Sequence, residues 1–329
     1  MPRAKMGDPA MRVLWTHNFD PARLNAGCFM YTAARGMTAL GVDVRLENLG
    51  NLRNPRTLAA ARRHIRNIAS NFDLVHAQYG SACALATSGC GVPSIVSLRG
   101  NDWNSVPRSS PSQWLHCQSA RLLTRVALPG FHAAVCVSHR MARDVAAVAP
   151  RLHIEVIPSA IDLSRWPVRT SLRVGPRPPH RVLFTANDQL DPNKGSQLLD
   201  AAVQLAAVRV GEIHVVRATG VAHDAMPALV ASCDIVACAS KSEGWPNSVK
   251  EALACGLPFV STDVSDLRVI ADIEPSCQIA DSNPISFANS LCAVLSQTEL
   301  PPLRRHVEPM DLVASSCRML ALYERLVAA

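Results

Sequence analysis

The sequence has no closely spaced cysteine pair and no long uninterrupted apolar run. Its eleven cysteines are odd in number, scatter from Cys28 to Cys317 and include no Cys-x2-Cys, so a disulfide framework and a zinc site both lack the spacing that they need. We expect them to be small buried side chains in a reducing cytosol. The longest uncharged stretch, 77–98, is broken by glycines and a proline, which indicates a strand–turn–strand region and not a membrane span.

Two further signatures are missing. Residues 1–20 carry charges but no apolar run followed by a small-residue cleavage site, so no secretory signal is expected. The one G-x-G piece, Gly89 to Gly91, lacks a third glycine and does not open a helix after a strand, which leaves a dinucleotide-dependent oxidoreductase unsupported. The sequence therefore predicts a soluble, cytoplasmic protein.

What is present favours a folded chain of two domains. Of its 329 residues 48% are apolar and 18% are charged, which excludes intrinsic disorder. A chain of this length buries enough surface to form a sizeable core without disulfides. Its length suits one large domain or two of ordinary size.

The basic residues are concentrated in the first half. Residues 1–170 hold 20 Lys and Arg against 9 Asp and Glu, whereas residues 171–329 hold 13 against 17. The first half should therefore prefer an anionic partner, either an acidic membrane surface or a phosphorylated acceptor. Nucleic acid is not favoured, because the arginines are not interleaved with aromatic residues and no nucleic-acid-binding module accompanies them. A solvated basic face without a partner is the alternative.

Short runs of Val, Ile and Leu alternate with stretches at helical spacing, which predicts an α/β protein with parallel sheets. A proline-rich segment between residues 163 and 180 is typical of a linker. We expect domains at 1–170 and 171–312, followed by a helix over 313–329 that packs back on the first domain. The predicted strands are 12–16, 42–46, 74–76, 94–98, 134–137, 153–157, 181–185, 212–217, 234–239, 258–261 and a short one near 278, and the clearest predicted helices are 30–40 and 58–68.

The most informative stretch, Ser240–Asp266, combines a strand end, a glycine turn, a helix and another strand. Asn247 or Ser248 suits the N-cap of that helix, and free backbone N–H groups at a helix start bind anions. Glu243 and Glu251, with seven residues between them, would flank such a site. On spacing alone, Ser248 to Glu251 fits equally well a capping box, in which Glu251 bonds only to its own helix start.

This run closely resembles the E-x7-E region of the family 4 retaining glycosyltransferases. It reads Glu243-Gly-Trp-Pro-Asn-Ser-Val-Lys-Glu251-Ala-Leu-Ala-Cys-Gly-Leu-Pro. The resemblance implies the GT-B fold, in which two Rossmann-like, doubly wound parallel-sheet domains face a central cleft and the C-terminal domain holds most of the nucleotide. Further segments that fall in the family's order are 72–76, 92–102, 135–138, 156–162, 220–227 and 233–236.

The resemblance also implies roles for individual residues. Glu251 would hold the ribose hydroxyls of the donor nucleotide, and Glu243 would lie near the transferred sugar. Lys194, in Asp191-Pro-Asn-Lys-Gly, would neutralise the diphosphate, although a lysine in a Lys-Gly pair is by default a solvated loop residue. Gly27 would belong to a first loop that closes over the sugar and phosphate. Backbone donors to sugar and phosphate are expected from Gly244, Trp245, Pro246, Asn247 and Ser248.

Two positions depart from the family pattern. Asn187 stands where members commonly carry an arginine for the diphosphate, and Arg99-Gly-Asn-Asp102 stands where many read His-Gly-x-Asp. Arg99 and Asp102 are candidate catalytic residues, with Arg99 taking over phosphate binding from the missing arginine. A structural pairing of Arg99 with Asp102 is the alternative.

The resemblance implies a nucleotide-diphosphate sugar as donor, with a UDP-sugar expected, and a saccharide or lipid-linked acceptor. No D-x-D occurs in the sequence, so neither the metal bridge of the other large glycosyltransferase fold nor a cofactor is expected. The helix start, Lys194 and Arg99 would carry the compensating charge. Retention follows by analogy with the family, if the leaving phosphate itself deprotonates the acceptor.

The sequence also allows two other functions and a contact with the membrane. Asn187 and Arg99 allow a binding or regulatory protein that has lost turnover. A nucleotide-sugar epimerase on the same scaffold is a weaker idea. Five arginines around one predicted helix would let the first domain rest peripherally on anionic lipid; they are Arg53, Arg56, Arg62, Arg63 and Arg66.

Overall fold

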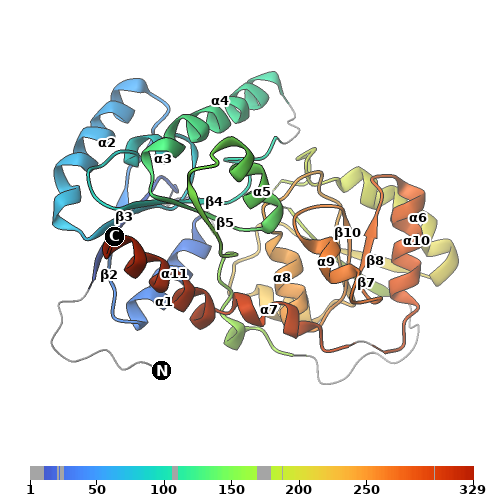
Figure 1. Ribbon diagram of the computed structural model, residues 1–329. Helices are drawn as coiled ribbons and strands as arrows, with labels where there is room; N and C mark the ends of the chain where they lie inside the picture. Colours follow the sequence, from blue (N-terminus) through green and yellow to red (C-terminus); the bar gives the residue numbers. More distant parts are fainter. Residues whose placement is uncertain are drawn as a thin grey trace.

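The computed structural model shows two α/β lobes side by side, joined by two passes of the chain (Figure 1). The first lobe contains an open sheet of six parallel strands, and the second an open sheet of five. The structure describes residues 11–20, 22, 26–105, 110–168, 179–186, 188–299 and 301–329.

The N-terminal sheet has the order β2-β1-β3-β4-β5-β6. Its central strands β3, β4 and β5 are buried along their whole length, as expected for parallel strands that are covered on both faces. The strands are β1 (Arg12–His17), β2 (Asp43–Asn48), β3 (Leu74–Ala77), β4 (Ser94–Leu98), β5 (Ala133–Cys136) and β6 (His153–Val156).

The C-terminal sheet has the order β11-β10-β9-β7-β8. It is also entirely parallel, with β7 paired between β8 and β9. Its strands are β7 (His180–Thr185), β8 (Ile213–Ala218), β9 (Ile235–Cys238), β10 (Phe259–Thr262) and β11 (Gln278–Ala280).

Helices cover both faces of each sheet (Figure 1). Side chains alternate along β1, so that Val13 and Trp15 pack with helices α1 and α11, whereas Leu14 packs with α2 on the other face. The helices are α1 (Cys28–Ala39), α2 (Pro55–Ile68), α3 (Ser81–Thr87), α4 (Pro111–Ala127), α5 (His139–Val148), α6 (Ser196–Val210), α7 (Met226–Ala231), α8 (Asn247–Ala254), α9 (Leu267–Ala271), α10 (Pro284–Leu295) and α11 (Leu312–Val327).

The last helix, α11, returns to the N-terminal lobe and packs against α1. Its Tyr323 is fully buried, and its hydroxyl accepts a hydrogen bond from Trp15 Nε1 at 3.0 Å. The same hydroxyl contacts His76 Nδ1, and His76 Nε2 lies 2.8 Å from Ser97 Oγ. A polar chain therefore ties the end of the sequence to three strands of the first sheet.

The two passes between the lobes run next to each other. The backbone N–H of Ile161 donates to Met310, and Leu312 donates back to the carbonyl of Ile161. Ile161 and Asp311 form a short parallel bridge. The lobes are thus joined by a double connection.

The strands predicted from the sequence are confirmed, with ends that differ by one or two residues. The predicted left-handed stop at Gly41 is also confirmed, with φ of 86°. Nine of the eleven cysteines are buried and all are free thiols. Within the described ranges, no helix is both long enough and apolar enough to cross a membrane.

Each sheet reverses its strand order at one place, between β1 and β3 in the first lobe and between β7 and β9 in the second. Ligands of open parallel sheets bind outside the carboxyl ends of the strands at such reversals. A ligand-binding site is therefore expected in the loops that follow these strands.

Candidate active site

The two lobes touch where the loop after β4 meets the turn before α8. A Cβ atom added to Gly244 would lie 1.9 Å from the carbonyl oxygen of Arg99, and one added to Gly100 would lie 3.2 Å from the Gly244 nitrogen. The first contact leaves no room for a side chain, and the second is tight. This pair of glycines therefore sets how closely the lobes approach.

A cavity of about 220 Å³ lies at this contact and is lined by both lobes. It brings together seven of the predicted site residues, from three separate stretches of the sequence. The lining residues are Phe29, Arg99, Val137, Ser159, Phe184, Thr185, Lys194, Ala237, Cys238, Ser240, Glu243, Trp245, Pro246, Asn247 and Ser248.

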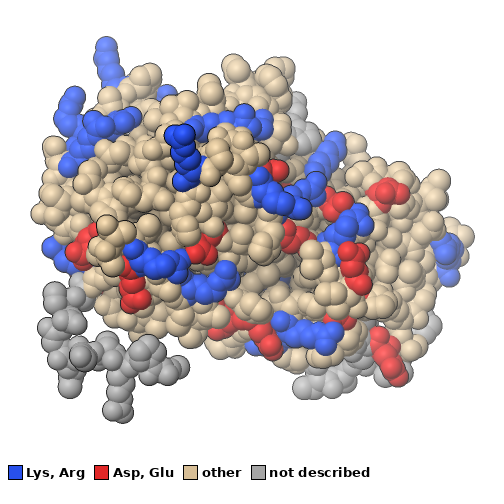
Figure 2. Space-filling model, viewed as in Figure 1, with Lys and Arg blue, Asp and Glu red and all other residues tan. Residues whose placement is uncertain are grey.

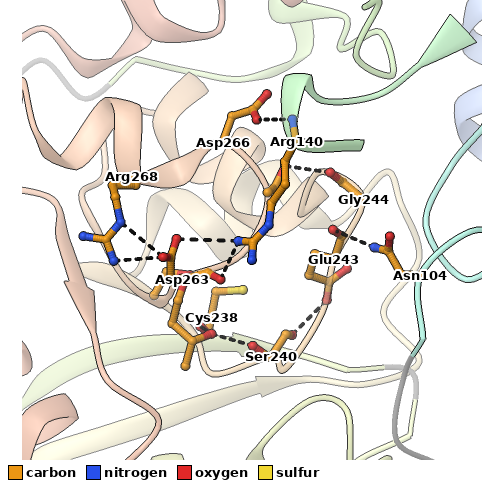
Figure 3. A network of polar contacts seen from close by, with 12 residues as sticks. Asn104, Arg140, Cys238, Ser240, Glu243, Gly244, Asp263, Asp266 and Arg268 are labelled. Atoms are coloured by element: carbon orange, nitrogen blue, oxygen red, sulfur yellow. Dashed lines mark hydrogen bonds and ion pairs between the residues drawn. The ribbon is translucent and has the colours of Figure 1, made fainter. Parts of the chain in front are cut away.

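Lys194 and Glu243 form an ion pair on the wall of this cavity, with Nζ 2.6 Å from Oε1. Ser240 Oγ donates to the same carboxylate oxygen at 2.8 Å (Figure 3). Burial lowers the pKa of Lys194, but the charge of Glu243 and the hydrogen bond to it outweigh burial, so that the pKa is raised. Lys194 is thus a firmly protonated cation and not a freely solvated loop lysine.

Gly195 holds Lys194 in place. It precedes helix α6 with φ of 69°, and a Cβ added to it would lie 2.1 Å from the carbonyl oxygen of Ala239. The Lys-Gly pair therefore turns tightly against the end of β9. This packing directs Lys194 toward the Glu243 turn.

Arg99 reaches into the cavity from the N-terminal lobe. Its guanidinium donates to Ser159 Oγ at 2.9 Å and to Gln78 Oε1 at 3.1 Å, and it lies over the ring of Phe29 at 4.6 Å from the centroid. Burial lowers its pKa to about 10. Arg99 remains a cation at neutral pH, and its described partners are neutral groups.

Asp102 does not line the cavity. Its buried carboxylate accepts backbone N–H bonds from Gly80, Arg99 and Gly100, and burial raises its pKa against the opposing effect of these bonds. Asp102 therefore shapes the loop that carries Arg99. The described contacts of the Arg99 guanidinium do not include a hydrogen bond to Asp102, so the expected alternative of a side-chain pair is not what the structure shows.

Helix α8 starts earlier than predicted, by one residue if Asn247 were the N-cap and by two if Ser248 were. Its N-cap position is Pro246, without a side-chain cap, and Asn247 is the first helical residue. The prediction of Asn247 or Ser248 as N-cap is wrong, because Pro246 already fixes an extended backbone before the helix. A capping box from Ser248 to Glu251 does not form either. The first residues of α8 line the cavity, and the helix start has no side-chain cap for its backbone N–H groups.

A second, smaller cavity of about 40 Å³ adjoins the first and is lined by Glu251. Phe29 and Asn247 line both cavities. Burial raises the pKa of Glu251 to about 7. The junction of the two cavities thus lies at the first residue of α8.

Lys250 is a site residue that the sequence did not reveal. It is 2% exposed, donates to the carbonyl of Ser159 in the other lobe, and lies 5.4 Å from the centroid of Trp245. Burial lowers its pKa to about 7. The one available signal was the apolar character of its surroundings in Val249-Lys-Glu-Ala-Leu-Ala, which indicates a helix buried on most sides.

Gly27 and Asn187 complete the predicted set. Gly27 precedes α1 with φ of 73°, and a Cβ there would lie 2.8 Å from the ring of Phe19. It lines neither cavity, but it positions Cys28 and Phe29, which do. Asn187 lies outside the described residues.

Comparison with known families matches two consecutive parts of the chain. Residues 13–165 match Glycosyltransferase Family 4, and residues 189–297 match Glycosyl transferases group 1. A comparison with curated protein sequences gives no match.

Solved structures with the same fold include three that align over nearly the whole chain. Sucrose-phosphate synthase from Thermosynechococcus elongatus has a TM-score of 0.73 at 13% identity, covering 97% of this chain and 99% of that one. Anabaena HepE in complex with UDP and glucose has 0.66 at 14%, covering 96% and 100%. A glycosyltransferase from Rickettsia africae has 0.68 at 14%, covering 97% and 99%. The chain belongs to the family 4 glycosyltransferases and is an enzyme with the GT-B fold.

Proposed function

We propose that this glycosyltransferase moves a sugar, with retention of configuration, from a UDP-sugar to a hydroxyl group of a saccharide or lipid-linked acceptor, and that it does so without a metal ion. The observation that carries the proposal is the pair of neighbouring cavities at the start of α8, which share Phe29 and Asn247 as lining residues. HepE, which has the same fold, is described in complex with UDP and glucose.

The residues that line the two cavities suggest one orientation for the donor. The ribose would bind Glu251 in the smaller cavity, and the sugar would lie near Glu243 in the larger one. The diphosphate that links them would then cross the junction at Asn247. There the open N–H groups of α8 and its dipole favour negative charge.

In this proposal two protein cations, Lys194 and Arg99, take the place of a divalent metal, and Lys250 adds charge when it is protonated. Lys194 lies on one side, Arg99 reaches in from the other lobe, and Lys250 lies beneath the helix start. Preorganised charge of this kind stabilises a leaving group most strongly where water is excluded. A diphosphate would also compete with Glu243 for Lys194 and release the carboxylate toward the sugar.

The proposed step is balanced within the bound substrates. The bond from the anomeric carbon to the phosphate oxygen breaks, a bond from that carbon to the acceptor oxygen forms on the same face, and the hydroxyl proton passes to the departing phosphate. No side-chain nucleophile is required. Arg99 and Lys194 stabilise the charge that develops on the diphosphate.

Donor binding and metal independence are tested together. UDP, GDP, ADP and their sugars are screened by thermal shift, because a ligand that binds only the folded state raises its apparent stability. Turnover of the selected donor is then measured with and without EDTA, and NMR assigns the anomeric configuration of the product. A strict requirement for added divalent cations, or an inverted product, contradicts the proposal.

We also propose that the basic face of α2 rests on anionic lipid. Arg56, Arg63 and Arg66 are exposed on this helix, and Figure 2 shows Lys and Arg gathered over it. Such a face gains roughly 1 kcal/mol per basic residue near an anionic surface. Sedimentation with phosphatidylglycerol vesicles should show binding that salt abolishes. Equal recovery with neutral vesicles rules the proposal out.

A further inference from the structure

A third cavity lies between the lobes, next to the proposed donor site. It has a volume of about 430 Å³ and is walled by helices α4 and α5 of the N-terminal lobe and by the segments 241–243 and 263–265 of the C-terminal lobe. Glu243 lines both this cavity and the donor cavity. A molecule bound here therefore lies next to the sugar that is to be transferred.

Two arginines of α4 are held on the wall of this cavity by one tryptophan. Arg121 donates through Nε to the carbonyl of Trp103 at 2.8 Å, and Arg125 lies over the Trp103 ring at 5.4 Å from its centroid. Trp103 itself is 4% exposed. The two guanidinium groups are four residues apart on one helix, where like charges repel each other.

No described carboxylate forms an ion pair with Arg121 or Arg125. Arg121 contacts neutral groups only, with Gln118 Oε1 at 2.7 Å as its second partner. Lys241, on the facing segment, is exposed and has no described side-chain partner. Three cations therefore face this cavity without an ion pair to a described carboxylate.

The carboxylates that line the cavity are largely committed elsewhere. Glu243 pairs with Lys194, and Asp263 lies between Arg140 and Arg268 (Figure 3). Of the lining carboxylates, Asp144 alone has no described ion pair. In Figure 2 basic and acidic side chains gather in the middle of the view, where the lobes meet. The cavity keeps a surplus of positive charge.

We infer that this cavity binds the acceptor and that the acceptor carries a phosphate or carboxylate group. The inference deepens the proposed function and rests on it. The anionic group would bind Arg121 and Arg125, whose planar guanidinium groups form bidentate hydrogen bonds with phosphates and carboxylates. The acceptor hydroxyl would then point toward Glu243 and the donor sugar. Lys241 would add a third positive charge from the opposite wall.

The test measures anion binding to the whole protein with the donor site filled. Glucose 6-phosphate, glucuronic acid, inorganic phosphate and glucose are each titrated into UDP-saturated protein by calorimetry. The two sugar anions should bind, and glucose should bind at least about tenfold more weakly, because hydrogen bonds between charged partners are stronger than neutral ones. The affinities for glucose 6-phosphate and glucuronic acid show whether a phosphate or a carboxylate is preferred.

Variants then locate the binding. Arg121→Gln with Arg125→Gln should lower the affinity for glucose 6-phosphate by at least about tenfold, and Lys241→Gln, which disturbs no described contact, should lower it severalfold. Arg143→Gln is the matched control, since Arg143 is exposed on α5 but does not line the cavity. The control should bind as the wild type does.

Two outcomes overturn the inference. One is glucose binding as tightly as glucose 6-phosphate, and the other is unchanged anion affinity in both the double variant and Lys241→Gln. A protein that fails to bind UDP instead contradicts the proposed donor site. The anion titrations of wild type and variants can then be run without UDP, so the two failures are distinguished.

Discussion

The carboxylate of Asp266, in the C-terminal lobe, accepts a hydrogen bond at 2.7 Å from the backbone N–H of His139, the first residue of α5 in the N-terminal lobe. Its second oxygen accepts the next N–H, from Arg140, at 3.0 Å (Figure 3). One lobe thus supplies an anion to the helix start of the other. This contact joins the lobes in the arrangement in which the cavities form.

Asp266→Ala should weaken this closure. The loss of a helix-terminal carboxylate costs about 0.5–2 kcal/mol, so the variant should unfold at lower temperature and show a larger radius of gyration by X-ray scattering. Asp272→Ala, at an exposed site after α9, is the control. Identical scattering curves for wild type and Asp266→Ala would show that the contact does not hold the lobes together.

Lys194→Ala should lower kcat by roughly 10²–10³-fold, the usual effect of removing one group that stabilises developing negative charge. Lys194→Arg keeps the charge and should retain more activity. Steady-state kinetics with the donor identified by thermal shift provide the measurement. If Lys194→Ala matches the wild type, the diphosphate does not bind where we place it.

Gly244→Ala should separate the lobes at the active site, because the added methyl group would lie 1.9 Å from the Arg99 carbonyl oxygen. We expect transfer to fall by more than about 100-fold, since small displacements of reacting groups have effects of that size. Gly220→Ala is the control. Gly220 has φ of 67° but open space around it, so its substitution adds backbone strain without a clash. An activity loss in Gly244→Ala no larger than in Gly220→Ala would show that the clash with Arg99 does not control transfer.

Lys250 should make stability depend on pH in an alkaline window. Burial and the nearby charge of Arg99 lower its pKa to about 7, although Glu251 opposes them. Between that value and 10.5 the unfolded chain binds a proton that the folded protein has lost, so the free energy of unfolding rises with pH. Below about 7 both states are protonated and this contribution is absent.

The measurement is urea unfolding of the wild type and Lys250→Met at several pH values. The wild type should gain stability relative to the variant as pH rises through this window. Parallel stability curves for the two proteins would mean that Lys250 keeps an ordinary pKa.

Tyr323→Phe should reduce the free energy of unfolding by about 1–3 kcal/mol, because it leaves the buried Trp15 N–H and His76 nitrogen without their shared partner. Tyr31→Phe serves as the control, since Tyr31 is 44% exposed. Denaturant titration compares the two. An equal, small change in both would show that the polar chain beneath α11 adds nothing to stability.

The sequence predicted the sheets well, because each buried parallel strand is a short apolar run bounded by turns. Glu243, Lys194 and Arg99, each predicted from a local motif in a loop after a strand, line one cavity. The error at the start of α8 was local too: Asn247 and Ser248 are good capping residues, but Pro246 occupies that position.

Other parts of the site depend on contacts between distant segments and left no local signal. Lys250 donates a hydrogen bond to the carbonyl of Ser159 in the other lobe. Asp266 caps helix α5, which lies more than a hundred residues earlier in the chain. Arg121 and Arg125 are ordinary helix residues until Trp103 orients them. Spacing along the chain carries no information about such pairs.

The double connection near Ile161 and Asp311 restricts how the lobes can move. A single linker segment would let one lobe rotate about the linker axis. Two linker segments that are hydrogen-bonded to each other resist this rotation, so that hinge bending is the motion that remains. Donor entry and product exit would then require a single hinge motion of the two lobes.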